Sequence, residues 1–411
     1  MEGFRRFASS RTSLFRASEI REILKLTEGK EVISLAGGLP DPRVFPKEEL
    51  AEIARQVIAE YGDMSLQYSP TMGVTAFRRE LASYLRSKGI AVREDDEIIV
   101  TTGSQEALFI IARTLIDPGD TIIVEEPTYL AAVNAFREHG AAFEAVPLDS
   151  HGMRTDILED KLKELKKEGK TPKLLYTVPT SQNPSGATMT QERRKHLVEL
   201  AEQYDFLIVE DDPYSYFLFE DVYFDYIKTL DKNYRVIYVS TASKILAPGI
   251  RLGWIVAHKD LVRLFEVGKQ SIDLHTPTLS QYIMMEAIKR GVVDRTIEVA
   301  RSIYREKRDV MMEALDTYLA GMAEWTRPLG GFFTMVTVKA NLDMKQLLEE
   351  AVNKYRVAYV PGESFFPVSK KKNTMRLNFS YPPPELIEEG VKRIGLLLRD
   401  RIGQATPVNS P

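Results

Sequence analysis

The first clear periodicity along the chain follows a Phe-Pro pair, where apolar residues recur at helical spacing at Leu50, Ile53, Ala54, Val57 and Ile58. This spacing predicts a helix that begins near Lys47, with Pro46 in its first turn. We expect residues 1–46, which precede this helix, to form an N-terminal arm.

Short apolar runs then alternate with helical patterns. The runs are rich in β-branched residues and do not alternate with polar residues, which is typical of strands buried on both faces of a parallel sheet. They are residues 97–100, 121–124, 174–178, 206–209, 236–239 and 254–257. The pattern predicts a large α/β domain over residues 47–287 with a mostly parallel sheet.

The pattern changes near residue 288, where a long charged helical segment begins and continues to about Leu319. Three apolar runs and a last helical pattern follow it, at residues 332–336, 357–360, 375–379 and 384–400. This order predicts a smaller α+β domain over residues 288–403, and we expect residues 404–411 to form a loose tail.

Length and composition narrow the possible functions. A chain of 411 residues is long enough for two domains with sizeable cores. The net charge of −4, with acids and bases interspersed, argues against nucleic-acid or membrane partners. Cysteine is absent, which excludes disulfides and thiolate chemistry, and the five histidines lack metal-ligand spacing, so we expect no metal. Without a signal peptide or an apolar run of about 20 residues, a cytoplasmic protein is expected.

Polar residues follow the carboxyl ends of the predicted strands, where open α/β sheets bind their ligands. They include Ser104 and Gln105 after the first strand, Tyr129 after the second and Asn183 after the third. The turn before Ser104 opens a helix, whose free N–H groups suit a phosphate. Taken singly, Ser104 fits an ordinary helix cap equally well, and Tyr129 and Asn183 fit structural roles.

Three adjacent acids, Glu210, Asp211 and Asp212, follow the strand at residues 206–209. A carboxylate beside two others at a buried strand end is destabilised unless a cation or a proton donor faces it. The N–H group of a pyridinium ring would supply that partner. Tyr214 lies just beyond, after Pro213.

The segment from Ser240 to Trp254 reads Ser-Thr-Ala-Ser-Lys-Ile-Leu-Ala-Pro-Gly-Ile-Arg-Leu-Gly-Trp. It places the amine of Lys244 between the hydroxyls of Thr241 and Ser243, and Pro248-Gly249 bends the chain so that Arg251 can return toward the lysine. A pyridoxal cofactor needs an amine for its aldehyde and hydroxyls and a cation for its phosphate. The segment is therefore similar to a pyridoxal-phosphate anchor.

Ordered motifs along the whole chain extend this similarity. They are residues 18–26 (Ser-Glu-Ile-Arg-Glu-Ile-Leu-Lys-Leu), 34–42 (Ser-Leu-Ala-Gly-Gly-Leu-Pro-Asp-Pro), 66–73 (Leu-Gln-Tyr-Ser-Pro-Thr-Met-Gly), 273–277 (Asp-Leu-His-Thr-Pro), 361–366 (Pro-Gly-Glu-Ser-Phe-Phe) and 375–379 (Met-Arg-Leu-Asn-Phe). With them the chain resembles the fold type I pyridoxal-phosphate aminotransferases, in the subgroup that acts on 2-aminoadipate, kynurenine and aromatic amino acids. The resemblance implies a seven-stranded, mostly parallel sheet in the large domain.

The resemblance also implies roles for the residues that bind the cofactor. Lys244 would form a Schiff base and act as the catalytic base, while Asp211 would keep the pyridine nitrogen protonated. Asn183 and Tyr214 would hydrogen-bond the phenolic oxygen, and Tyr129 would stack on the ring. The phosphate would be held by Ser104, Gln105, Thr241, Ser243 and Arg251, with Tyr68 reaching in from the other subunit of a homodimer.

For the substrate, the resemblance implies that Arg376 clamps the α-carboxylate with help from Gly38 and Asn183. Arg21 could face an acidic side chain of the donor, but it could equally well be an ordinary exposed arginine on a helix. The expected reaction moves the amino group of 2-aminoadipate, glutamate, kynurenine or an aromatic amino acid to a 2-oxo acid such as 2-oxoglutarate. The chain departs from the usual Ser-Phe-Ser-Lys of the family at Ala242, and both hydroxyl positions survive.

Two other functions share these motifs. A pyridoxal-phosphate lyase or decarboxylase would use the same residues equally well. A regulator that carries this fold as a sensor beside a DNA-binding domain would need a basic N-terminal domain of several tens of residues, and the arm motifs already occupy the residues ahead of Gly37.

Overall fold

The computed structural model describes residues 2–17, 19–29 and 31–405. Met1, Ser18, Lys30 and residues 406–411, which form most of the predicted tail, lie outside the described residues. The last helix, α15 (Pro384–Ala405), extends past the predicted end at residue 400 and includes the first residues assigned to the tail.

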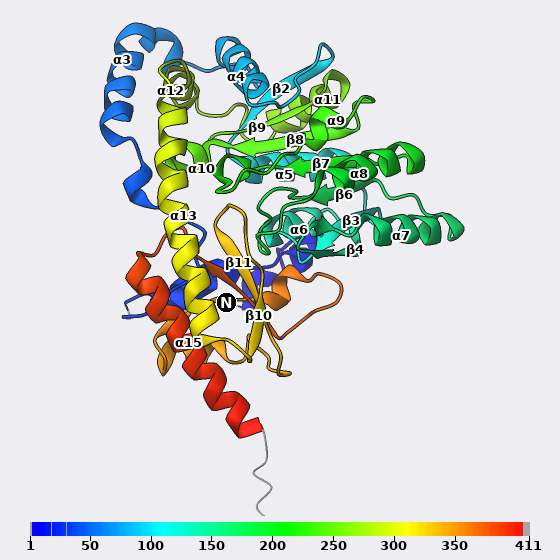
Figure 1. Cartoon of the computed structure of the whole chain (residues 1–411). Helices are drawn as coiled ribbons and strands as arrows, with labels where there is room; N and C mark the ends of the chain where they lie inside the picture. The colour runs from blue at the N-terminus through cyan, green and yellow to red at the C-terminus, as the bar shows by residue number, and fades with distance from the viewer. Residues whose placement is uncertain (1, 18, 30, 406–411) are drawn as a thin grey trace, which may run out of the picture.

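An eight-stranded sheet forms the centre of the upper part of the molecule in Figure 1. Its strands, in spatial order, are β2 (Asp96–Thr101), β9 (Gly253–His258), β8 (Val236–Thr241), β7 (Leu207–Asp211), β6 (Leu174–Thr177), β3 (Thr121–Glu126), β4 (Ala142–Asp149) and β5 (Gly152–Met153). β8, β7, β6, β3 and β4 are parallel, whereas β9 runs antiparallel to both of its neighbours. The mostly parallel sheet is therefore confirmed.

The expected count of seven strands differs from the structure by one short strand. β5 has two residues and pairs only with Leu148 and Asp149 at the end of β4. It forms because Gly152, at a φ of 87°, lets the chain turn back directly after β4.

Both faces of the sheet are covered, which explains why its strands read as continuous apolar runs. Alternate residues of β6 belong to different core clusters: Leu174 and Tyr176 pack with α5 (Ser104–Leu115) and α6 (Leu130–Arg137), and Leu175 packs with α7 (Thr155–Lys167) and α8 (Gln191–Tyr204). The remaining helices of this part are α3 (Lys47–Ser65), α4 (Thr75–Ser87), α9 (Ile227–Leu230), α10 (Ala242–Ile245), α11 (Lys259–Gln270) and α12 (Thr278–Lys289).

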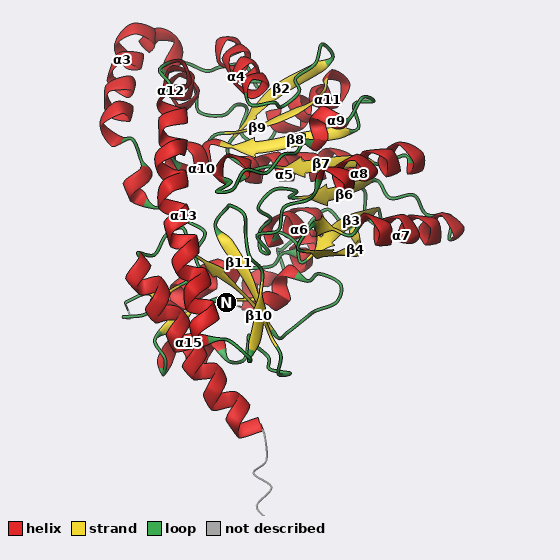
Figure 2. Ribbon diagram, viewed as in Figure 1, coloured by secondary structure: helices red, strands yellow, loops and turns green. Residues whose placement is uncertain are grey.

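The lower part is built on an antiparallel sheet (Figure 2). Its order is β10 (Ala323–Trp325), β11 (Phe333–Val338), β14 (Thr374–Asn378) and β13 (Val360–Pro361). The predicted strand at residues 357–360 divides at Tyr359, because β12 (Val357–Ala358) leaves this sheet to pair in parallel with β1 (Ile33–Ser34). α13 (Val292–Tyr318), the long yellow helix of Figure 1, runs past both parts, and α14 (Leu348–Asn353) and α15 complete the lower one. The domain boundaries at residues 46/47 and 287/288 stay predictions.

The N-terminal segments reach both parts of the molecule, since Leu14 and Phe15 line a pocket with Phe109 of α5. They are α1 (Glu2–Arg5), η1 (Ser10–Leu14), α2 (Glu19–Thr27) and η2 (Pro42–Val44). In α2 the side chain of Ile23 is buried in a cluster with Met335 and Phe365, and Glu19 lies 3.2 Å from the amine of Lys345. These contacts fix α2 against β11 and β13.

Residues 35–41, which we call the strap, cross between the two parts and are fixed at both ends. At one end, the carbonyl oxygen of Leu35 accepts a hydrogen bond from the N–H of Asn378 at 2.9 Å, and the N–H of Leu35 donates to the carbonyl oxygen of Ala358. At the other, Lys307 from α13 donates to Asp41 at 2.6 Å, and both side chains are almost fully buried. A buried ion pair of this kind resists separation, because either charge left alone would be costly. The strap is therefore held in one position.

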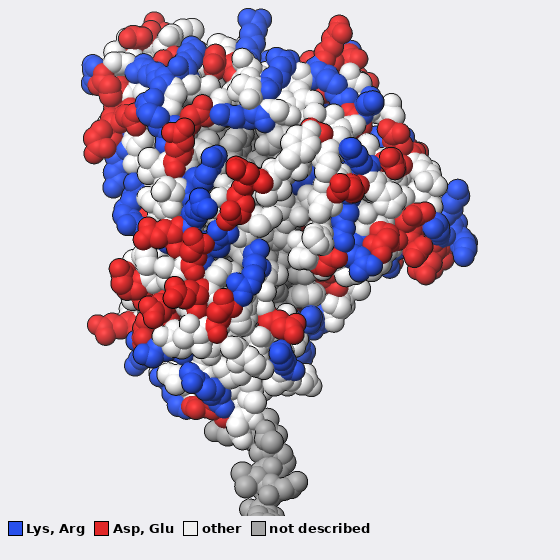
Figure 3. Space-filling model, viewed as in Figure 1, with Lys and Arg blue, Asp and Glu red and all other residues white. Residues whose placement is uncertain are grey.

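The outer surface shows no large region of a single charge in the view of Figure 3, where acidic and basic side chains are interspersed. Within the described residues, none of the helices is both long and apolar enough to cross a bilayer. The same part of the chain contains no group of acidic and histidine side chains arranged to hold a metal ion.

Candidate active site

A cavity of about 440 Å³ lies where the carboxyl ends of the large sheet meet the strap and the smaller sheet. Its walls contain every residue predicted to bind cofactor or substrate except Tyr68: Arg21, Gly38, Ser104, Gln105, Tyr129, Asn183, Asp211, Tyr214, Thr241, Ser243, Lys244, Arg251 and Arg376. Leu39, Val178, Pro213 and Phe333 complete the lining. The convergence follows from topology, because parallel strands end at one edge of a sheet.

Lys244 reaches the cavity from α10, which begins directly after β8. Thr241 caps this short helix by accepting the N–H of Ser243 at 3.1 Å, so the lysine position is set within one turn of the strand end. The Nζ of Lys244 donates to the carbonyl oxygen of Gly38 in the strap at 2.9 Å. Desolvation, and then the nearby charges of Arg376 and Arg251, lower the pKa of Lys244 to about 8. About a tenth of the amine is thus neutral, and nucleophilic, at pH 7, far more than for an ordinary lysine.

Asp211 is the one member of the acidic triplet that lines the cavity, because side chains alternate along β7. Glu210 accepts the N–H groups of Ile227 and Lys228, and Asp212 accepts Ser215 and Tyr238. In Asp211, Oδ2 accepts the hydroxyl of Tyr176 at 2.7 Å, whereas the buried Oδ1 has no partner among the described residues.

This free oxygen fits a ligand that carries a hydrogen-bond donor. Desolvation raises the pKa of Asp211 to about 7, despite the bond from Tyr176, and the neighbouring charge of Asp212 adds to the rise. A buried carboxylate in this state gains most from a cationic donor, and the N–H of a pyridinium ring is one. The residues present therefore fit the ring nitrogen of pyridoxal phosphate.

Asp211→Asn should stabilise the cofactor-free protein at pH 8. The folded state holds the Asp211 proton up to about pH 7, whereas the unfolded chain loses it near 3.8, so wild-type stability falls as pH rises between these values. Asparagine cannot ionise, so the variant avoids this loss. We expect its free energy of unfolding to exceed that of wild type by on the order of a few kcal/mol at pH 8 and to differ little at pH 4. Urea unfolding at both pH values tests it. Glu125 and Glu210, whose pKa values burial also raises to about 7, are present in both proteins and cancel. An equal difference between the proteins at both pH values would contradict it.

Arg376 extends from β14, opposite Met335, and its side chain is buried. Its Nη1 donates to Asn183 Oδ1 at 2.9 Å, and its Nη2 donates to the strap carbonyls of Ala36 and Gly37 at 3.0 Å each. The buried Nε has no partner among the described residues. The guanidinium lies 4.1 Å from the ring centre of Phe333 and 5.3 Å from that of Phe365.

Among the described residues, no carboxylate forms an ion pair with Arg376. Burial lowers its pKa to about 10, and the groups that oppose this shift are the phenols of Tyr214 and Tyr129. The residue therefore stays protonated near neutral pH, held in a fixed orientation with an unused donor. Such a guanidinium is suited to bind a carboxylate.

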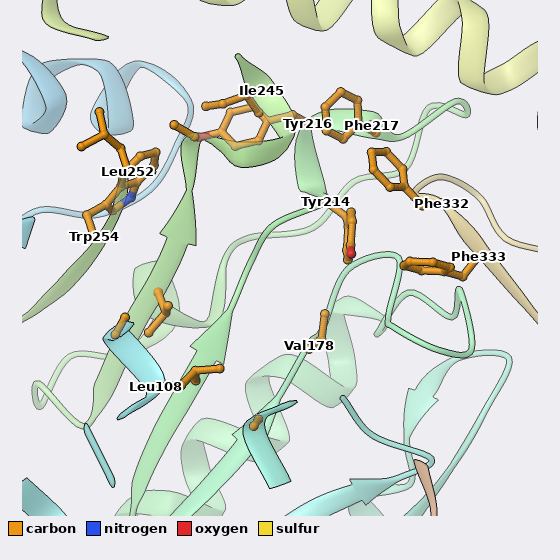
Figure 4. Packing of buried hydrophobic residues seen from close by; sticks show 14 of the residues in the cluster. Leu108, Val178, Tyr214, Tyr216, Phe217, Ile245, Leu252, Trp254, Phe332 and Phe333 are labelled. Atoms are coloured by element: carbon orange, nitrogen blue, oxygen red, sulfur yellow. The ribbon is translucent and has the colours of Figure 1, made fainter. Parts of the chain in front are cut away.

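Aromatic rings form the side of the cavity next to Asn183. Tyr214 is buried, and its ring meets that of Phe333 edge-on at 5.9 Å, as Figure 4 shows. Burial raises the pKa of Tyr214 well above its ordinary value, so its hydroxyl remains a hydrogen-bond donor. Tyr129, at the start of α6, has its pKa raised to about 12 for the same reason.

The opposite end of the cavity gathers groups that suit a phosphate. Ser104 and Gln105 begin α5, directly after Gly103. Arg251 follows the turn at Pro248–Ile250 and donates to the carbonyl oxygen of Thr102 at 3.3 Å. Gly103 has a φ of 78°, a conformation that L side chains rarely adopt, and a Cβ there would lie 2.4 Å from Nη2 of Arg251, so this position favours glycine. Helix N–H groups, hydroxyls and a cation together match a phosphate dianion.

Tyr68 lies apart from this cavity. Its side chain is 77% exposed, and its ring meets that of His275 edge-on at 5.6 Å. Arg21 lines the mouth from the exposed face of α2. The other predicted residues are brought together within one chain.

Sequence reasoning missed two residues that complete the site. Phe333 supports both Tyr214 and Arg376, but it lies in a strand that reads as ordinary core. Tyr176 donates to Asp211 from the neighbouring strand β6. Pairing β6 with β7 in parallel register would have placed Tyr176 beside the acids, since strand ends align in such sheets.

Comparison with known proteins agrees with this geometry. The model of the family described as aminotransferase class I and II matches residues 30–394. The chain is 47% identical to aromatic-amino-acid aminotransferase 1 of Thermococcus litoralis (97% of this chain, 95% of that protein) and 38% identical to 2-aminoadipate transaminase of Thermus thermophilus (93% and 94%). Its structure superposes on a kynurenine aminotransferase of Pyrococcus horikoshii, solved in complex with PMP, at a TM-score of 0.93 and 45% identity (97% and 98%). The chain therefore belongs to the class I and II aminotransferases and is a pyridoxal-phosphate-dependent enzyme.

Proposed function

We propose that this enzyme transfers the amino group of 2-aminoadipate, glutamate, kynurenine or an aromatic amino acid to a 2-oxo acid, with 2-oxoglutarate as the acceptor. The 2-aminoadipate, kynurenine and aromatic donors are those named for its relatives. The observation that carries the proposal is that one cavity holds the amine of Lys244, the free Oδ1 of Asp211 and the unneutralised guanidinium of Arg376. These three groups match the reacting carbon, the ring nitrogen and the substrate carboxylate, respectively.

In this proposal the cavity residues hold the cofactor at three places. Asp211 accepts the ring N–H, and Asn183 and Tyr214 bind the phenolic oxygen while Tyr129 stacks on the ring. The phosphate is held by Ser104, Gln105, Thr241, Ser243 and Arg251. When bound, pyridoxal phosphate supplies an aldehyde carbon for the amino group and a ring that withdraws electrons from the substrate.

Arg376 and the backbone of Gly38 bind the substrate α-carboxylate and orient Cα toward Lys244. Nζ of Lys244 would then take the proton from Cα and, in the reverse direction, return it there. Its pKa of about 8 suits a group that must both accept and return a proton near neutral pH. General acid–base catalysis of this kind contributes about 10²- to 10⁴-fold in rate.

We also propose a homodimer in which Tyr68 of each subunit binds the phosphate in the other. The exposed ring of Tyr68 lines a surface pocket together with Leu66, which is also large, apolar and exposed, and Pro277. Exposed apolar residues that lie together in this way are typical of an interface. The proposed contact between Tyr68 and the phosphate of the other subunit is inferred from the resemblance to the family.

The visible absorbance of the purified holoenzyme tests the reaction directly. Adding glutamate or 2-aminoadipate should change the spectrum of the bound cofactor, and adding 2-oxoglutarate should restore it. Assays for the 2-oxo product, ammonia and carbon dioxide distinguish transfer from the lyase alternative. A spectrum that responds to the amino acid while ammonia or carbon dioxide accumulates would refute amino transfer.

Arg21→Ala should lower kcat/KM for 2-aminoadipate about tenfold relative to phenylalanine. The second carboxylate of 2-aminoadipate would lose one charge-assisted hydrogen bond at the exposed mouth, whereas phenylalanine would lose none. Lys25→Ala is the matched control, because Lys25 is an exposed cation on the same helix, paired with Glu22. If the ratio of the two substrates is unchanged in Arg21→Ala, this residue does not contact the donor side chain.

A further inference from the structure

Two loops form one wall of the cavity, and a side chain that does not itself line the cavity joins them. The first loop, residues 127–129, follows β3 and ends at Tyr129. The second, residues 178–188, follows β6 and presents Asn183. Gln182 lies between them and is only 1% exposed.

The amide of Gln182 contacts both loops. Its Nε2 donates to the carbonyl oxygen of Pro127 at 2.7 Å and to Glu125 Oε2 at 3.1 Å, and its Oε1 accepts the N–H of Ser185 at 2.8 Å. Both of its ends are therefore engaged. A flipped amide would set its oxygen against two acceptors and its NH₂ against a donor, so the network permits only one orientation.

Glu125 connects this network to the sheet. It is buried beneath the two loops, and it accepts the hydroxyl of Thr177 at 2.6 Å and the N–H of Val178 at 3.2 Å in addition to Gln182. Its partners come from β6 and the residue after it, so Gln182 is held relative to the sheet and not only to the loops. The backbone of Gln182 also closes its own loop, donating to Ala187 at 2.9 Å.

We propose that Gln182 is a positioning residue, which fixes the amide of Asn183 relative to the ring of Tyr129 and so sets the width of the cofactor slot. The proposal rests on the function proposed above. Gln182 acts through its neighbour Asn183, whose Oδ1 is the acceptor for Arg376 at 2.9 Å, and through the Pro127 carbonyl two residues before Tyr129. A loss of Gln182 should therefore weaken both cofactor and α-carboxylate binding.

The test compares Gln182→Met with Gln281→Met. Methionine keeps an unbranched side chain of similar size and removes the amide. Gln281 is the matched control, because it too is buried and joins two backbone segments, accepting Val74 N–H at 2.7 Å and donating to Thr276 O at 2.9 Å. The readouts are the equilibrium Kd of pyridoxal phosphate for enzyme stripped of cofactor, the KM for glutamate with a 2-oxo acid other than 2-oxoglutarate as acceptor, and the midpoint of urea unfolding.

We expect Gln182→Met to raise the Kd for pyridoxal phosphate and the KM for glutamate at least about tenfold each. A tenfold change corresponds to the loss of roughly one hydrogen bond. Gln281→Met should lower the unfolding midpoint by a similar amount but keep both constants within about threefold of wild type. Equal losses in the two variants, or unchanged constants in Gln182→Met, would overturn the proposal.

A double-mutant cycle checks the route of the effect. In an Asn183→Ala background, Gln182→Met should no longer raise the KM for glutamate, because the amide that it positions is gone. A full additional increase in KM would show that Gln182 does not act through Asn183. If the wild-type enzyme itself failed to bind pyridoxal phosphate, the proposed function would be refuted. If the wild-type enzyme binds it and Gln182→Met has the same Kd and KM, only the role of Gln182 is refuted.

Hydrogen exchange of the wild-type protein provides a test that needs no variant. Binding of pyridoxal phosphate should slow exchange in the peptides covering residues 125–130 and 181–187 together, since one amide joins the loops. Protection of one loop without the other would overturn the proposal even if Gln182→Met does not fold.

Discussion

Replacing Lys244 with alanine should lower kcat by at least about 10⁴-fold, because the variant loses both the nucleophilic amine and the base that moves the Cα proton. The fold should remain intact. Within the described part of the chain, the amine makes one hydrogen bond, to the carbonyl oxygen of Gly38, and the removal of a cation from desolvated surroundings offsets the loss of that bond. Steady-state transfer from 2-aminoadipate to 2-oxoglutarate measures the effect, and the urea unfolding midpoint checks the fold.

A chemical readout accompanies the rate. Borohydride reduction of the wild-type holoenzyme should leave the mass of the cofactor on the peptide that contains Lys244, and the alanine variant should show no such adduct. Lys244→Arg is the control for charge, since arginine keeps the cation but is not a nucleophile at neutral pH; it should be as inactive as alanine. Turnover of Lys244→Ala at the wild-type rate would refute the central assignment.

The strands of the large sheet could be predicted where burial on both faces leaves a continuous apolar run, as in β6 and β8. β4 lacks that signal. It is half-exposed along most of its length, contains Pro147 and lies toward the edge of the sheet beside the short β5. Tyr359 shows a second limit, because one residue outside the pairing divides a single apolar run between two sheets.

The site could be predicted where its residues directly follow strand ends, as Asn183 and Asp211 do. Contacts between distant segments carry no local signal. Arg376 is 193 positions from Asn183, and the strap carbonyls that fix its other nitrogen are farther still. Resemblance to a family supplied Arg376, whereas the bonds that orient it came only from the fold.

Buried polar residues away from the cavity were the least predictable. Arg194 in α8 reads as a surface arginine among charged neighbours, yet it is fully buried and donates to the carbonyl oxygens of Pro179 and Met189. It also supplies positive charge near Glu210 and Asp212. The sequence raised the question of what balances this acidic triplet, and the structure answers it with Arg194 on one face and a ligand site at Asp211 on the other.

Arg376 is where the second large effect is expected. Arg376→Met should lower kcat/KM for amino acid donors by about 10²- to 10⁴-fold, the loss of two charge-assisted hydrogen bonds worth about 1.5–3 kcal/mol each. Arg376→Lys should lose less, roughly 10- to 100-fold, because an ammonium keeps the charge but cannot form the paired contact.

Most of this loss should be in KM, because the α-carboxylate is bound in the ground state as well as in the transition state. The Kd of a dicarboxylate inhibitor that lacks an amino group should rise in parallel, which separates binding from chemistry. Arg308→Lys is the matched control: Arg308 is nearly buried, donates to the Pro328 carbonyl at 2.7 Å and lies 5.2 Å from the ring centre of Phe219, but does not line the cavity. If Arg376→Met retains wild-type KM and inhibitor affinity, the carboxylate is bound elsewhere, and the free donor of this buried guanidinium serves another ligand.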